Sequence, residues 1–174
     1  MAFLLRMIER VTGMAGLVIA WLGFPLVLAM CFEVFSRYAL NAPTIWAFEL
    51  SYMAMGTHAL IGAAYTLRER GHIRLDIFYS RFSPKTKALI DTLGYLVLFL
   101  PVVSLVSLGL WEYWVEAFVG EFRSGQSAWN PIIWPFRLAF FLGFALLWLQ
   151  GIAEFIKCLR FLAGRTDDLD AANG

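Results

Sequence analysis

The stretch "SRYALNAPTIWAFEL", residues 36–50, is the most informative part of the chain for the fold, because it places charged, turn-forming and aromatic residues between two long apolar segments. These segments, residues 11–36 and 44–67, are each long enough to cross a bilayer as a helix of about 20 residues. The residues between them fit either a reaction site or a joint between two helices. The remaining sequence is needed to choose between a reaction site and a joint.

The composition predicts an integral membrane protein. Of the 174 residues, 60% are hydrophobic and 16% are charged, and the mean hydropathy is +0.69. A water-soluble domain of this size is far less apolar. The formal net charge is +1 and the basic residues lie in scattered loops, so a nucleic acid partner is not expected, because phosphate binding needs a clustered basic face.

Four segments reach the length of a spanning helix: residues 11–36, 44–67, 88–114 and 131–162. They lack the alternating pattern of about ten residues that marks a membrane barrel, and a backbone in lipid must satisfy its amides within its own element. The expected fold class is therefore all-α, an integral membrane domain of four transmembrane helices over residues 1–164. Residues 165–174 are expected to form a disordered cytoplasmic tail.

The basic residues predict the orientation. Arg6 and Arg10 precede the first segment, and further basic residues gather between the second and third segments and after the fourth. Because basic residues stay on the cytoplasmic side, both termini should be cytoplasmic, and loops 37–43 and 115–130 should face outward. A cleaved signal is a less favoured alternative, since the apolar run exceeds about 15 residues. Aromatic residues fall at the outer level, where amphipathic rings favour the interface: Trp46, Trp111, Tyr113, Trp114, Trp129 and Trp134.

The inner loop, residues 68–87, has its own pattern. Leu75, Phe78 and Phe82 recur at helical spacing with charged residues between them. This pattern predicts a short helix lying in the inner headgroup region between the second and third spans. Ser83 is a candidate N-cap for the next span, which Pro84 would open.

Ionisable residues are nearly absent at half depth, where a transporter's own site usually shows itself. Glu33 lies four residues before Arg37, which suits a helical ion pair. Glu49 has no basic residue one turn away in its own helix, so we expect a partner on another helix or subunit, with Arg37 or Arg137 nearest by depth. A proton-carrying role for Glu49 is the alternative.

No cofactor or metal is expected, and the chain is not expected to be an enzyme, since it holds no metal-ligand cluster, phosphate loop or nucleophile arrangement. His58 lies alone near the middle of a span, where a hydrogen bond to a neighbouring helix is commoner than haem ligation. Cys31 and Cys158 fall near opposite faces of the bilayer, so they should not pair. The chain has the features of a scaffold.

Three motifs in order resemble the small membrane subunit of tripartite ATP-independent periplasmic (TRAP) transporters, the DctQ type. They are Ser36-Arg37-Tyr38 with Asn41-Ala42-Pro43, Trp46 and Glu49; Gly71-His72-Ile73-Arg74-Leu75-Asp76; and Ser127-Ala128-Trp129-Asn130-Pro131 followed by Trp134-Pro135.

The resemblance implies a subunit of a bacterial inner-membrane transporter. Its partners would be a large multi-span permease subunit, which holds the substrate and cation sites, and a periplasmic binding protein that captures an organic acid. The small subunit would brace the permease during carboxylate uptake, usually by symport with sodium, and help dock the binding protein. The opening stretch is then a joint, and we expect the structural or subunit contacts to involve Arg37, Asn41, Pro43, Trp46, Glu49, His72, Arg74 and Asp76, and docking to involve Glu116, Glu121, Arg123, Trp129 and Asn130.

Two rival functions remain at this point. One is a membrane anchor of a respiratory complex that holds haem or quinone between helices, which would show a Soret band. The other is a small autonomous exporter in which Glu33 or Glu49 exchanges protons for substrate. This exporter would have to transport without any partner.

Overall fold

The computed structural model describes residues 2–69 and 82–164, and within these ranges it contains helices and no strand. The elements are α1 (Ala2–Ala39), α2 (Ala47–Arg68), α4 (Pro84–Leu93), the π-helical segment η1 (Gly94–Phe99), α5 (Leu100–Val119) and α6 (Trp134–Leu162). An isolated antiparallel bridge joins Arg123 to Ile132 in the loop before α6. The predicted all-α class is confirmed for the described part of the chain.

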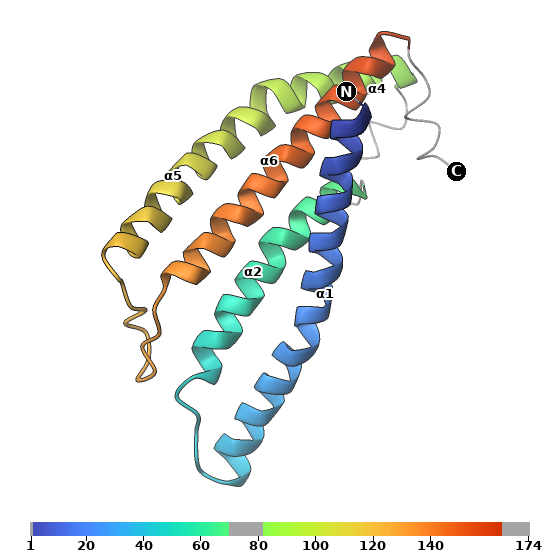
Figure 1. Ribbon diagram of the computed structural model, residues 1–174. Helices are drawn as coiled ribbons and strands as arrows, with labels where there is room; N and C mark the ends of the chain where they lie inside the picture. Colours follow the sequence, from blue (N-terminus) through green and yellow to red (C-terminus); the bar gives the residue numbers. More distant parts are fainter. Residues whose placement is uncertain (1, 70–81, 165–174) are drawn as a thin grey trace.

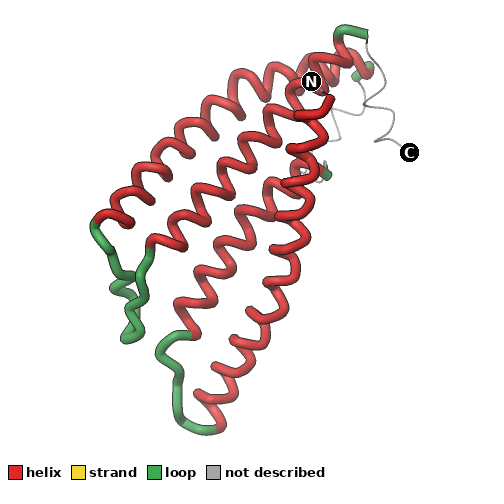
Figure 2. The backbone as a smooth tube through the Cα atoms, in the orientation of Figure 1, coloured by secondary structure: helices red, strands yellow, loops and turns green. Residues whose placement is uncertain are grey.

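The four long helices lie side by side in one layer, in the order α5, α6, α2, α1 (Figures 1 and 2). The main helix contacts are α1 with α2, α2 with α6, and α6 with α5, and α4 also packs on α6. The loops 40–46 and 120–133 lie at one end of the layer, called the loop end below. The start of α1 and the end of α6 lie at the opposite, terminal end (Figure 1).

Three helical stretches of the described chain are long and apolar enough to cross a membrane: Phe3–Ala39, Pro84–Val119 and Trp134–Leu162. The second predicted span forms a helix, α2, whose 22 residues give a length of about 33 Å. Its sequence is less apolar because it carries Glu49, His58 and several hydroxyl side chains. The fourth crossing therefore remains a prediction.

The predicted boundaries shift at several helix ends. The first helix starts at Ala2 rather than at residue 11, and α6 starts at Trp134 rather than at residue 131, because residues 131–133 pair with the start of their own loop. The cap predicted at Ser83 is confirmed, since its Oγ accepts a hydrogen bond of 3.3 Å from the amide of Thr86. The interfacial helix predicted in the inner loop and the tail 165–174 lie outside the described residues, apart from residues 68–69 and 82–87.

The third span contains a π-helical turn for a reason that the sequence shows. Pro101 has no amide hydrogen, and its ring crowds the carbonyl one turn earlier, so the regular hydrogen-bond pattern cannot continue through it. Immediately before it, η1 widens the helix, and the amide of Leu100 donates to the carbonyl of Tyr95, five residues back. Such single-turn widenings relieve a local conflict without ending the helix.

Small residues set how closely the helices approach. A Cβ at Gly143 of α6 would lie 2.9 Å from Leu60 Cβ and 3.4 Å from the Leu60 carbonyl carbon on α2. A Cβ at Gly151 would lie 2.2 Å from the ring of Phe99. Because lipid supplies no hydrophobic force between helices, close packing at such glycines is a main source of their association.

Candidate functional site

The turn between α1 and α2 is held by the carboxylate of Glu33. One oxygen accepts a hydrogen bond of 2.9 Å from Nε of Arg37 and a second bond from Nη2 of the same guanidinium. The other oxygen accepts a bond of 2.9 Å from the amide of Thr44 and one from its hydroxyl. Glu33 is buried, whereas half of the Arg37 side chain is exposed. The expected Glu33–Arg37 pair is present, and Glu33 also fixes the turn itself.

The other residues of this turn shape the backbone. Asn41 has a φ of 48°, a left-handed conformation that asparagine tolerates better than most residues. After it, the amide of Ala42 donates 3.0 Å to the carbonyl of Ser36. Pro43 does not open α2, which begins at Ala47; Trp46 precedes the helix and stacks on Phe32 of α1 with ring centres 6.3 Å apart. The stretch thus forms a structured joint.

Glu49 is fully buried in the first turn of α2, and its partner comes from the loop between α5 and α6. Oγ of Ser124 lies 2.7 Å from one carboxylate oxygen of Glu49 and 2.8 Å from the other. Neither of the two arginines that the sequence suggested as partners of Glu49 forms an ion pair with it. Arg37 is bound to Glu33, and Nη1 of Arg137 donates 3.0 Å to the carbonyl of Tyr113.

Ser124 was missed by sequence reasoning because a lone serine in a loop carries no signal of its own. Its only marker is its place in the loop between two spans, at the same end as Glu49. The contact joins residues 75 positions apart. It ties the α5–α6 loop to α2.

The loop 120–133 is folded on itself. The amide of Ser124 donates 3.0 Å to the carbonyl of Pro131, and the amide of Ile133 donates 3.0 Å to that of Phe122. Asn130 lies at the centre: its carbonyl accepts a bond of 3.1 Å from Nη1 of Arg123, and its side-chain oxygen accepts one of 2.9 Å from the amide of Gly125. The loop is a compact hairpin-like turn.

The residues proposed for docking cluster in and beside this loop. Glu121 and Asn130 have left-handed backbones with φ of 48° and 44°, and Trp129 is 39% exposed. Arg123 is exposed, and Glu116 is exposed on the last turns of α5. The structure thus brings the five residues to the loop end, on a loop whose shape is fixed by its own hydrogen bonds.

A second polar cluster lies at the terminal end, between α1 and α6. Nζ of Lys157 lies 2.7 Å from a carboxylate oxygen of Glu9 and 2.7 Å from one of Glu154, and Nε2 of Gln150 donates 2.9 Å to Glu154. The Lys157 side chain is only 13% exposed. The sequence reasoning did not single out this cluster, although Gln150, Glu154 and Lys157 recur at helical spacing on one face of α6.

Of the remaining positions singled out from the sequence, the structure describes His58 and the two cysteines. His58 is exposed and makes no hydrogen bond to a described residue, while His72, Arg74 and Asp76 lie outside the described residues. Cys31 and Cys158 form no disulfide with each other. Among the described residues, no group of three potential ligands could hold a metal ion.

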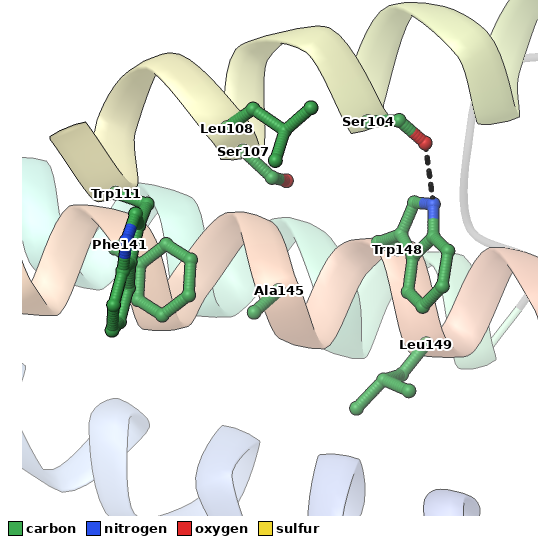
Figure 3. A pocket seen from close by; sticks show the side chains of 8 residues that line it. All are labelled: Ser104, Ser107, Leu108, Trp111, Phe141, Ala145, Trp148 and Leu149. Carbon is green, nitrogen blue, oxygen red and sulfur yellow. Dashed lines mark hydrogen bonds between the residues drawn. The ribbon is translucent and has the colours of Figure 1, made fainter.

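A groove of about 560 Å³ lies between α5 and α6 (Figure 3). Its lining is aromatic and aliphatic, with Trp111 and Phe141 at one end and Trp148 at the other (Figure 3). Nε1 of Trp148 donates 2.8 Å to Oγ of Ser104. The groove offers apolar contact and carries no charged side chain that could take part in chemistry.

Comparison with known proteins gives one match. The family model described as "Tripartite ATP-independent periplasmic transporters, DctQ component" matches residues 26–161. The match covers most of the chain, including the joint, Glu49, the loop 120–133 and the α6 part of the terminal cluster. No curated protein and no solved structure matches the chain.

Proposed function

We propose that this chain, which belongs to the DctQ component family of the tripartite ATP-independent periplasmic transporters, is the fixed scaffold of such a transporter. Membership makes the chain a small permease subunit and a multi-pass membrane protein. The proposal adds that it braces the large permease subunit, helps dock the binding protein and serves the uptake of an organic acid. It places the protein in a bacterial inner membrane with both termini in the cytoplasm.

The main support for the scaffold role is that the buried carboxylates are hydrogen-bonded within the chain. Glu33, Glu49 and Glu154 are the buried acidic residues of the described chain, and each accepts hydrogen bonds from its own chain. All three lie toward the helix ends, and among the described residues His58 is the ionisable side chain near the middle of a span, with no hydrogen bond to another described residue. Carboxylates held in this way link structural elements and are not open to a passing anion or cation.

The flat shape of the helix layer favours contact with a large membrane partner. Four helices in one row leave two broad faces, and large apolar side chains are exposed along α1 and α5, among them Trp21, Phe24 and Leu105. Lipid covers such a surface, and so does a second membrane subunit packed through small residues and aromatic rings. The joint residues, together with His72, Arg74 and Asp76 of the inner loop, are our candidates for this contact.

Reconstituted transport tests the scaffold role. Proteoliposomes that contain this chain alone should show no accumulation of a carboxylate, whereas the chain together with its permease subunit and binding protein should accumulate it. Omission of this chain from the complete system should abolish uptake that depends on the binding protein. Accumulation by this chain alone would overturn the proposal.

Charge reversal tests the docking role. The double variant Glu121→Arg/Arg123→Glu should slow association of the binding protein at low salt and have less effect at high salt, because rim charges act mainly on the association rate. Lys85→Glu at the terminal end is the matched control and should leave association unchanged. If the double variant supports normal uptake at low salt, the loop 120–133 is not the dock.

A further inference from the structure

A second groove, of about 630 Å³, lies between α1 and α2 at the terminal end of the layer. Glycines of α1 let side chains of α2 approach closely along it: a Cβ at Gly13 would lie 2.9 Å from the Arg68 guanidinium, and a Cβ at Gly16 would lie 2.3 Å from the ring of Tyr65. Among the lining residues, the polar ones are Glu9, Arg10, His58, Tyr65, Thr66 and Arg68.

The mouth of this groove is basic. Arg10 is exposed and makes no ion pair with another described residue, and the side chain of Arg68, which also lines the groove, is one-third exposed. Arg68 lies 2.9 Å from Glu69, which is itself half exposed. Glu9, the acidic residue among those that line the groove, is bound to Lys157. The positive charge of Arg10 is therefore left without a counter-charge from the described chain.

The inner part of the groove is mostly apolar, and its length fits one leaflet. It runs from Arg68 to His58 along α2, which is about 15 Å for ten residues at the helical rise. Half of a hydrocarbon core of about 30 Å has the same depth. Met14 and Leu17, on the α1 side, are 69% and 63% exposed. An extended hydrocarbon chain entering from the basic mouth would end near the midplane.

We infer that this groove binds one anionic phospholipid of the leaflet at the terminal end, with its phosphate at Arg10 and Arg68 and one acyl chain between α1 and α2. Arginine holds phosphate oxygens through several directed hydrogen bonds, and basic pockets between spanning helices suit anionic headgroups. The acyl chain would cover Gly62, a lining residue at which an added Cβ meets nothing within 4 Å. The scaffold role does not require this site.

Photolabelling tests the site on the full-length chain in phosphatidylcholine nanodiscs. Phosphatidylglycerol with a photoreactive acyl chain should label the groove, within residues 13–23 or 58–66. Each of Arg10→Gln and Arg68→Gln should lower the labelling about fivefold. Gly62→Leu should remove it, because a Cβ at this position meets no atom within 4 Å and the rest of the side chain would extend into the groove.

Matched controls separate the site from general membrane effects. Lys85→Gln removes an exposed charge at the same end of the layer but outside the groove, and Gly109→Leu adds a side chain at another open helical glycine. Both should label like the unmodified protein. The inference fails if the arginine variants label normally, if Lys85→Gln is equally depleted, or if a phosphatidylcholine probe labels as strongly. It also fails if Gly62→Cys crosslinks to the permease subunit in the assembled transporter, which would place a protein helix in the groove.

Discussion

Ser124 and Glu49, 75 residues apart, form the contact that links the α5–α6 loop to α2: the serine hydroxyl lies 2.7 and 2.8 Å from the two carboxylate oxygens. One hydroxyl has one proton, so it donates to one oxygen at a time. Glu49 is fully buried and depends on this donor. The loop that we propose as the dock is thus held by the helix that begins at the joint.

Ser124→Ala should destabilise the loop end, because it leaves a buried carboxylate without its serine donor. We expect a loss of about 1 to 2 kcal/mol in the free energy of unfolding, measured by denaturation in mixed micelles. Ser127→Ala is the matched control, since Ser127 makes a local bond of 3.1 Å to the amide of Trp129. Equal effects of the two substitutions would argue against a special role for the Ser124–Glu49 contact.

Glu49→Gln should preserve both the complex and uptake. The amide oxygen of glutamine still accepts a hydrogen bond from Ser124, whereas the charge and the capacity to carry a proton are lost. Co-purification with the permease subunit and binding-protein-dependent uptake should both be measured. Loss of uptake in an intact complex would show that Glu49 acts chemically, contrary to the scaffold proposal.

Glu33 and Arg37 should contribute unequally to the joint. Glu33→Ala removes the acceptor of the bonds that Arg37 and Thr44 donate to this carboxylate, whereas Arg37→Ala removes a half-exposed partner and leaves the bonds from Thr44 in place. We expect Glu33→Ala to cause the larger loss in the free energy of unfolding, because it removes the bonds from both partners while Arg37→Ala removes those from one. Unfolding of the two variants in the same micelles checks the order, and a reversed order would contradict the central place of Glu33.

Lys157→Met should loosen α1 from α6. The substitution leaves Glu9 and Glu154 facing each other without the cation between them, and removal of one partner of a buried ion pair costs about 3 kcal/mol. Limited proteolysis should cleave the residues before Glu9 faster than in the unmodified protein. The free energy of unfolding in micelles should fall. Lys85→Met, at an exposed position, should stay within about 0.5 kcal/mol of the unmodified protein.

Gly143→Ala and Gly109→Ala should differ in their effect on the free energy of unfolding. A methyl group at Gly143 meets Leu60 at 2.9 Å and must push α6 away from α2, at a cost of about 1 to 3 kcal/mol. At Gly109 nothing lies within 4 Å, so alanine should be neutral or stabilise the helix by up to about 1 kcal/mol. Two similar results would mean that α2 and α6 are not in close contact at Gly143.

Sequence reasoning succeeded where partners are close along the chain. Glu33 and Arg37 are four residues apart on one helix, and Ser83 caps the helix that follows it. It located the joint but started α2 at residue 44 instead of Ala47, because Pro43 is only one of several residues that can precede a helix. It also proposed arginines for Glu49, because charge is visible in a sequence and a serine donor on a distant loop is not.

The sequence by itself determined that this protein is helical and membrane-bound, and it placed the four long helices and the loops 40–46 and 120–133 approximately, because apolar length and helical spacing are local properties. Only the tertiary structure decided that the helices lie in one row, that Ser124 meets Glu49 and that Lys157 meets Glu9. In a membrane, side chains that face lipid and side chains that face another helix are both apolar. Hydropathy therefore cannot tell which helices are neighbours, and the contacts between them have to be read from the fold.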